Sequence, residues 1–255
     1  MIDLQIRYYH RPRVVGISEA EIGHRMLPRS LRREEMALVM VDVWSDHHIA
    51  THLDRGRDIT LTKIRPAMEA FRRAGATVIH APGSEAAPKY PDRLHSVARE
   101  VNEAEPPADW PPADFRKKTG AYAGLAISVE SGREAVAKIS EDRQIIPEVE
   151  PEGDDVVVET GDDLHDLLHQ RGILHLFYVG FAANICVPFK SYGTRAMKDR
   201  GYEIILVRDC TTAIETGDTL DGMEITKNAV RDTELNVGYT IASSELIEAC
   251  DKARG

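Results

Sequence analysis

The sequence predicts an α/β fold: a doubly wound, mostly parallel sheet flanked by helices in a three-layer, Rossmann-like arrangement. Five short runs are apolar at nearly every position, which is typical of strands buried on both faces of a sheet. Segments with apolar residues at helical spacing separate several of these runs, and alternating strands and helices are typical of parallel sheets. Of the 255 residues 42% are apolar, which is enough for one sizeable core.

Composition and charge exclude several classes of partner. No run of about 18 apolar residues is present, so no membrane span is expected, and the charged N-terminus does not resemble a signal peptide. The net charge of −10 and the lack of a basic track argue against nucleic acid. Cys186, Cys210 and Cys250 form no CxxC pair, so we expect free thiols in a reducing compartment. We therefore expect the protein to be cytoplasmic and to act on a small-molecule substrate.

Residues 1–35 are expected to form an N-terminal arm without a core of its own. Residues 4–9 alternate loosely between apolar and polar and are compatible with an edge strand. The charged, proline-containing stretch that follows is expected to cross the surface or to reach a partner subunit, which favours a homo-oligomer. The remaining residues, 36–255, are expected to form the main domain.

That domain is expected to open with a strand, a helix and a second strand. Residues 37–41 form an apolar run that ends at Asp42, and residues 77–80 form another. Between them, residues 58–74 repeat apolar side chains at helical spacing, which predicts a right-handed parallel crossover. Because open parallel sheets bind ligands at the carboxyl ends of their strands, Asp42 is a candidate site residue. A cap or turn residue is the alternative.

Residues 104–153 are the least regular part of the chain and are expected to be an insertion. Four prolines between positions 106 and 112 argue against a helix there, and the basic residues 116–118 follow. A helix is expected over residues 131–139. The insertion could form a lid or a pocket wall, or it could be a surface excursion without a role.

The alternation continues in the second half of the chain. A strand over residues 155–158 ends at Glu159, a helix begins near residue 164, and a further strand covers residues 203–207. Residues 176–179 are strand formers that break at Gly180. A helical pattern follows, with Cys186 among its first residues, and a closing helix is expected over residues 242–249.

The position of Cys186 suggests an activated thiol. A helix N-terminus carries partial positive charge and unpaired N–H groups, which favour thiolate over thiol and can hold an oxyanion. The alternative is a small buried cysteine that packs the helix against the sheet. Asp42, Glu159 and the turn before Cys186 are all expected at one edge of the sheet, and this shared location favours a functional role for each.

Two separated motifs resemble the isochorismatase-like cysteine hydrolases, which include nicotinamidases, N-carbamoylsarcosine amidases and ureidoacrylate amidohydrolases. The first is the strand motif VMVDV at residues 39–43, and the second is VGFAANICV at residues 179–187. The resemblance covers about residues 36–250 and also implies an oligomer.

The resemblance implies the roles of the site residues. Cys186 would be the nucleophile and Asp42 the general base, and the backbone N–H groups of Ala182 and Cys186 would form the oxyanion hole. The peptide between Phe181 and Ala182 is expected to be cis. The implied reaction is the hydrolysis of a small amide, ureide or carbamoyl compound through a thioester, without a cofactor.

One position departs from the family pattern, because Glu159 stands where the family places a lysine. Asp42 and Glu159 could share a proton, or the reversed charge could disable hydrolysis and leave a ligand-binding or structural protein. Lys117 or Lys118 could supply the missing cation, although both could equally belong to a solvated basic patch. A vinyl-ether hydrolase that acts by acid catalysis is a third possibility.

A metal site is not expected. Where nicotinamidases carry an Asp-x-His…His pattern, this chain offers His80 alone. Asp46, His47, His48 and His52 are clustered and could bind a divalent cation, but their spacing matches no zinc pattern. Residues 44–52, 81–120 and 160–165 are expected to line the substrate pocket, with Trp44 and His48 as candidate substrate contacts.

Overall fold

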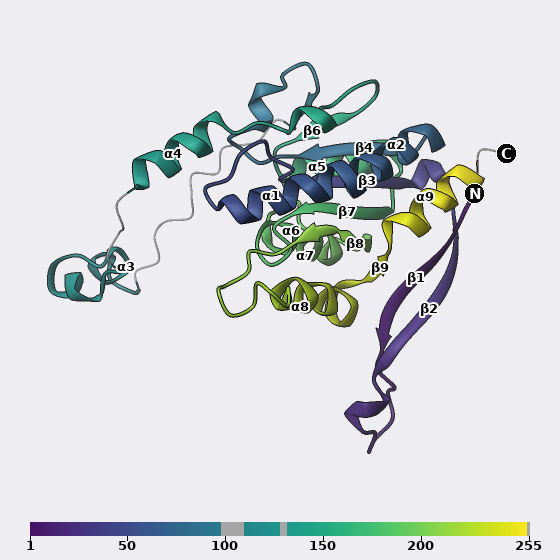
Figure 1. The fold of residues 1–255 in the computed structure, drawn as a ribbon, viewed down its shortest axis with the longest axis horizontal. Coiled ribbons are helices and arrows are strands. Elements are labelled where there is room, and N and C mark those ends of the chain that lie inside the picture. The colour runs from purple at the N-terminus through teal and green to yellow at the C-terminus, as the bar shows by residue number, and fades with distance from the viewer. Residues whose placement is uncertain (98–109, 128–131, 254–255) are drawn as a thin grey trace.

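The computed structural model of the chain describes residues 1–97, 110–127 and 132–253. Residues 104–109 and 128–131 of the expected insertion therefore lie outside the described residues. The described residues form an α/β fold, in which helices cover both faces of a nine-stranded sheet (Figure 1). The predicted fold class is therefore confirmed. None of the described helices is both long and apolar enough to cross a lipid bilayer.

Seven strands are parallel and form the body of the sheet, in the order β9-β8-β7-β3-β4-β6-β5. The five predicted strands are all among them, and their bounds are β3 Met36–Val41, β4 Thr77–Ala81, β6 Val156–Val158, β7 His175–Phe181 and β8 Glu203–Thr212. Two short strands without a clear pattern complete the series, β5 Leu94–His95 and β9 Tyr239–Ile241.

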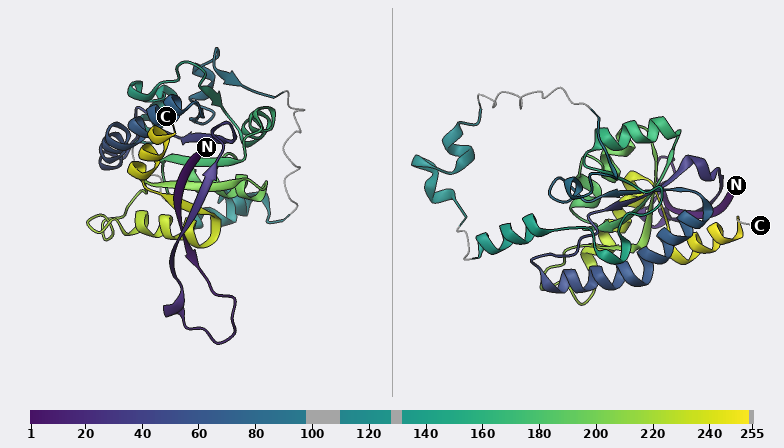
Figure 2. Two further views of the ribbon diagram at one scale, coloured as in Figure 1. Left: turned by 90° about the vertical axis from the view of Figure 1, so that its right-hand side faces the viewer. Right: turned by 90° about the horizontal axis from the view of Figure 1, so that it is seen from above.

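The N-terminal segment is a hairpin that extends this sheet. Its antiparallel strands β1 (Ile2–His10) and β2 (Gly23–Leu31) include the expected edge strand, and β1 pairs with β9. Ile2, Leu4 and Ile6 are buried in the main core, whereas the far end of the hairpin projects from the body (Figures 1 and 2). The base of the expected arm is thus continuous with the domain.

Alternation along the strands separates two hydrophobic layers. In β3, Leu38 and Met40 face one layer, and Ala37, Val39 and Val41 face the other. The helices of the first layer are α1 Ala50–Ile59, α2 Arg65–Ala74 and α9 Ser243–Lys252, and those of the second are α5 Gly161–Arg171, α6 Cys186–Phe189, α7 Thr194–Asp199 and α8 Glu224–Asp232.

The helix predicted over residues 58–74 is longer than expected. It starts at Ala50, passes through a wider turn at residues 60–64 and continues as α2, with Pro66 among the first residues of α2, where a missing N–H is tolerated. The insertion carries α3 (Ala113–Lys117) and α4 (Arg133–Asp142), and α4 matches the helix expected there. Figure 1 and the right view of Figure 2 show α3 apart from the sheet.

Candidate active site

Asp42 follows the last residue of the central strand β3. The backbone of Asp42 has a left-handed conformation with φ of 48°, which aspartate adopts more readily than most residues. Its N–H donates to Ala81 O at 3.1 Å, and its carbonyl accepts the Trp44 N–H at 3.0 Å. The chain therefore turns away at this point while the Asp42 side chain stays at the sheet edge, only 1% exposed.

The neighbouring strand β7 approaches β3 very closely at Gly180. The φ of Gly180 is 113°, and a Cβ atom there would lie 1.9 Å from Val41 O. Only glycine fits this conformation and this approach. The close contact brings the turn after β7 beside Asp42.

That turn leads directly into α6, whose first residue is Cys186. Ala182 O accepts hydrogen bonds from the N–H groups of Ile185 (3.0 Å) and Val187 (3.2 Å). The peptide between Phe181 and Ala182 is cis, as the resemblance implies. The Ala182 N–H interacts with the Cys186 sulfur and so favours its thiolate, which is compatible with the proposed oxyanion donor.

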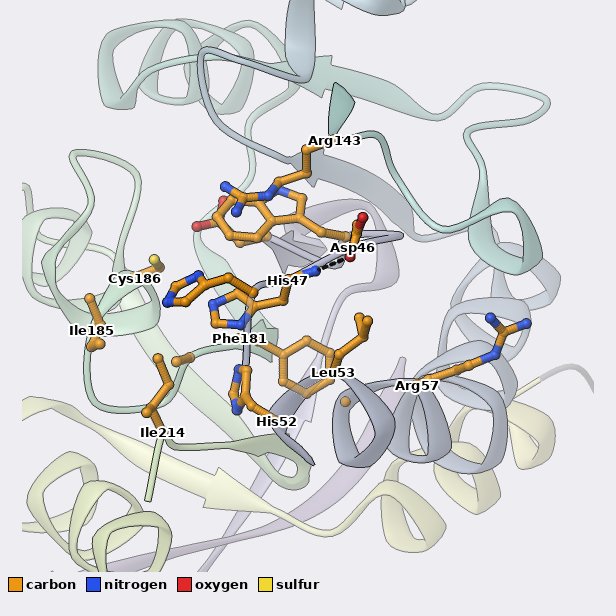
Figure 3. A pocket seen from close by; sticks show the side chains of 15 residues that line it. Asp46, His47, His52, Leu53, Arg57, Arg143, Phe181, Ile185, Cys186 and Ile214 are labelled. Carbon is orange, nitrogen blue, oxygen red and sulfur yellow. Dashed lines mark hydrogen bonds between the residues drawn. The ribbon is translucent and has the colours of Figure 1, made fainter. Parts of the chain in front are cut away.

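Asp42 and Cys186 line one cavity of about 280 Å³ (Figure 3). Trp44, His47 and His52 form part of its wall, together with Phe181. His48 also lines the cavity, so the structure brings together both expected contact residues of the segment 44–52. The other two expected segments, 81–120 and 160–165, contribute none of their described residues to its lining, so that part of the prediction is wrong. Cys186 is half-buried, whereas Cys210 and Cys250 are buried.

Burial dominates the electrostatics of Asp42 and raises its pKa to about 6. Interactions with the Cys186 thiol, Lys190, Tyr192 and Arg143 oppose this effect. Asp42 Oδ1 accepts a hydrogen bond of 3.0 Å from the Tyr192 hydroxyl. Asp42 Oδ2 is buried and has no conventional hydrogen-bond partner among the described residues.

Burial also raises the pKa of the Cys186 thiol to about 12, and the adjacent Asp42 carboxylate adds to the rise. Lys190 and the Ala182 N–H oppose it without cancelling it. The predicted lowering of this pKa is therefore wrong for the resting site. The reason is that α6 has only four residues, so its dipole is small beside the cost of burying a charge. The resting pair is a neutral thiol next to a carboxylate.

Glu159 does not take part in this pair. It follows β6, which β4 separates from β3, and it is not among the residues that line the cavity. The groups that shift the pKa of Asp42 do not include Glu159. The expected proton-sharing pair of Asp42 and Glu159 is therefore not found, although Asp42, Glu159 and the turn before Cys186 all lie at the same edge of the sheet.

Lys117 and Lys118 are also remote from Asp42. They lie at the end of α3, and the Lys118 ammonium lies 3.6 Å from the centre of the Phe115 ring. Two other cations act on the pair instead. Lys190, in the turn after α6, and Arg143, in the insertion, both lower the pKa of Asp42.

The sequence analysis missed Arg143, Lys190 and Tyr192. Lys190 and Tyr192 follow Cys186 within six positions, so a search of the turn after the nucleophile helix could have found them. Arg143 follows α4 and lines the cavity, so the insertion does contribute a pocket wall. Nothing in its local sequence distinguishes it, because its position depends on the path of a long loop.

The histidines near the cavity pack against one another. His47 stacks on His48 at 4.5 Å and meets His52 edge-on at 5.0 Å. Burial lowers the pKa of His47 to about 4 and also lowers that of His52. His80 is buried elsewhere against Asp155, at 3.2 Å. In the part of the chain that the structure describes, no group of three or more histidine, cysteine or acidic side chains could hold a metal ion.

Comparisons with known proteins identify the family and the fold. The Isochorismatase domain family matches residues 36–234. The ureidoacrylate amidohydrolase RutB of Acinetobacter baylyi (strain ATCC 33305 / BD413 / ADP1) is 29% identical over 189 residues, which cover 68% of this chain and 73% of that protein.

Two solved structures share the fold. A cysteine hydrolase from Pseudomonas syringae pv. phaseolicola 1448A has a TM-score of 0.57 at 19% identity, covering 88% of this chain and 95% of its own. An isochorismatase-like hydrolase from Alkaliphilus metalliredigens has a TM-score of 0.50 at 15% identity, covering 84% and 98%. Since the family match spans most of the chain, this protein belongs to the isochorismatase-like cysteine hydrolase superfamily.

Proposed function

We propose that the protein is a cysteine-dependent amidohydrolase that acts on a small amide, ureide or carbamoyl compound. One observation carries the proposal: the Asp42 carboxylate and the Cys186 thiol line the same cavity and interact with each other. The similarity to a ureidoacrylate amidohydrolase supports a ureide or carbamoyl substrate.

The first half of the proposed reaction forms a thioester. Asp42 accepts the thiol proton as the Cys186 sulfur attacks the carbonyl carbon, because the resting thiol is neutral at pH 7. The backbone N–H groups of Ala182 and Cys186 hold the negative oxygen of the tetrahedral intermediate. Protonated Asp42 then gives its proton to the leaving amine or ammonia as the C–N bond breaks.

The second half returns the enzyme to its starting state. Asp42 takes a proton from a water molecule, whose oxygen attacks the thioester carbonyl. The C–S bond then breaks, the acid leaves, and Asp42 returns the proton to the Cys186 sulfur. A carboxyl pKa of about 6 suits both transfers, since such a group is ionised at neutral pH and still donates readily.

The test is release of ammonia or amine from a panel of small amides, ureides and carbamoyl compounds. We expect activity that Cys186→Ser abolishes and that Asp42→Asn lowers about 100-fold or more. Mass spectrometry of the quenched enzyme should find the acyl group on Cys186. Glu159→Gln is the control and should retain activity, because Glu159 does not line the cavity.

The second candidate is a member of the family that binds a small ligand without hydrolysing it. Glu159, in place of the family lysine, favours this alternative. It predicts that no member of the panel yields product or acyl-enzyme. Glu159→Lys would distinguish a decayed site, because activity gained only in that variant would support the loss of an ancestral reaction.

A further inference from the structure

The Arg143 guanidinium is largely buried beside the cavity and makes no hydrogen bond with another described residue. Arg143 is 7% exposed, and its Nε atom has no hydrogen-bond partner. Among residues 1–97, 110–127 and 132–253 it forms no ion pair. The carboxylates of Glu85, Asp42 and Asp46 act on Arg143 without forming an ion pair with it. A largely buried charge without a hydrogen-bonded counter-ion is costly. Such a group at a cavity wall indicates a missing anionic ligand.

The stacking of Arg143 on Trp44 fixes the plane of the guanidinium. Its central carbon lies 3.7 Å from the centre of the Trp44 ring. Trp44 is itself held, since its indole N–H donates to Pro82 O at 2.7 Å. A guanidinium held by its face keeps its edge donors available for the two oxygens of a carboxylate. In Figure 3, Arg143 extends over the upper wall of the cavity that Cys186 also lines.

The other arginine of the wall and two of its histidines are less suited to this role. Arg57 lines the same cavity but is paired with Glu148 at 2.6 Å. The imidazoles of His47 and His52 are neutral near pH 7, because burial lowers their pKa values. Arg143 is therefore the one unpaired arginine or lysine among the described residues that line the cavity.

We propose that Arg143 binds a carboxylate of the substrate, so that the site takes acid amides or ureido acids rather than neutral amides. The carboxylate would lie against the guanidinium while the scissile carbonyl lies at Cys186. The identity of the bond that is cleaved depends on the proposed function. The recognition of a carboxylate by Arg143 does not.

Binding, rather than turnover, tests this proposal. Calorimetry is carried out on the full chain carrying Cys186→Ser, which blocks turnover, with two matched pairs of probes: succinamate against succinamide, and N-carbamoylglycine against N-carbamoylglycinamide. We expect tighter binding of the acid in at least one pair. Arg143→Gln should weaken binding of that acid about ten- to a hundredfold and leave the neutral member nearly unchanged. Arg57→Gln, which alters a paired arginine of the same cavity, should leave the preference for the acid intact.

Arg143→Lys keeps the charge without the planar fork, so a smaller loss confined to the acid is expected, and this variant serves if Arg143→Gln does not fold. Equal affinity for the acid and neutral members of both pairs, including no binding of either, would overturn the proposal. So would equal losses for acid and neutral probes in the Arg143 variants, which would indicate a purely structural role. If the acids bind through Arg143 but the unmodified enzyme releases no ammonia, the inference holds and the proposed hydrolysis fails.

Discussion

The Tyr192 hydroxyl donates a hydrogen bond of 3.0 Å to Asp42 Oδ1, and both groups are buried. Tyr192 is itself held from the neighbouring strand, because the Tyr178 hydroxyl donates to Tyr192 O at 2.8 Å. One carboxylate oxygen of the proposed base is thereby fixed, and the other is left without a conventional partner. This arrangement orients the base without neutralising it.

The hydrogen bond from Tyr192 should set the acid limb of the pH–rate profile. The pKa of Asp42 is about 6, so kcat/KM of the parent enzyme should rise with pH up to about that value, where the base is ionised. Tyr192→Phe removes a donor that stabilises the ionised form. The pKa of Asp42 must then rise, and the limb should move upward by about one pH unit.

The control is Tyr202→Phe, which removes a hydroxyl that is bonded to His165 and is not among the groups that shift the pKa of Asp42. Its profile should coincide with that of the parent. An unshifted limb in Tyr192→Phe would show that this hydroxyl does not tune the base.

The burial of Asp42 should also cost stability. Burial raises its pKa from 3.8 to about 6, so the folded state binds the proton more tightly than the unfolded state. Above pH 6 the ionised carboxylate therefore destabilises the fold, by about 3 kcal/mol, and this cost disappears as the pH falls from 6 towards 3.8. Asp42→Asn should raise the free energy of unfolding at pH 7.5 by up to that amount and by less at pH 4.5, as measured by urea titration.

Asp155→Asn provides a control of opposite sign. Burial alone would raise the pKa of Asp155, but hydrogen bonds from His80 and Arg72 hold it below its usual value. The ionised form of Asp155 therefore stabilises the fold above its ordinary pKa, and its loss should destabilise the protein at pH 7.5. A decrease in the free energy of unfolding for Asp42→Asn would contradict the inference that burial of the ionised Asp42 carboxylate destabilises the fold.

Much of the fold could be predicted because its central strands are buried on both faces. Short, continuous apolar runs such as residues 37–41 are typical of strands buried on both faces. The hairpin partner β2 was missed because it is a largely exposed edge strand that contains Pro28 and polar residues on both faces. β9 was missed because three residues, Tyr239–Ile241, are too few to establish a period.

The site could be predicted in part, for a related reason. Asp42 directly follows β3, and Cys186 follows the turn after the neighbouring strand β7, so the pairing of these two strands brings both to one edge of the sheet. The pKa of Cys186 could not be predicted, since burial outweighs the field of a four-residue helix. Arg143 could not be predicted either, because its contact with Trp44 is determined by tertiary packing of the insertion.

Among the lysines, Lys190 rather than Lys117 or Lys118 should act on the catalytic pair. Lys190 lowers the pKa of both Asp42 and Cys186, so Lys190→Met should raise both. The Asp42 carboxylate would then be ionised only at higher pH, and the Cys186 thiol would be harder to deprotonate. We expect kcat to fall about tenfold at pH 7 and the acid limb to move to higher pH.

Lys190→Arg keeps the charge and should retain most of the activity. The double variant Lys117→Met/Lys118→Met should match the parent in steady-state assays. If the double variant loses activity and Lys190→Met does not, Lys117 or Lys118 supplies this charge instead of Lys190.

Gly180 is the position at which fold and site depend on one contact. A Cβ atom would lie 1.9 Å from Val41 O, at a φ of 113°, so Gly180→Ala must separate β7 from β3 just where Asp42 meets the turn before Cys186. We expect a loss of more than about 4 kcal/mol in unfolding free energy or failure to fold. Gly172→Ala is the matched control, because its φ of 67° is also positive but no atom lies within 4 Å of the added carbon. That variant should lose only about 1 kcal/mol and keep its activity. Comparable losses in the two variants, measured by chemical denaturation, would mean that backbone conformation matters at Gly180 and the approach of the strands does not.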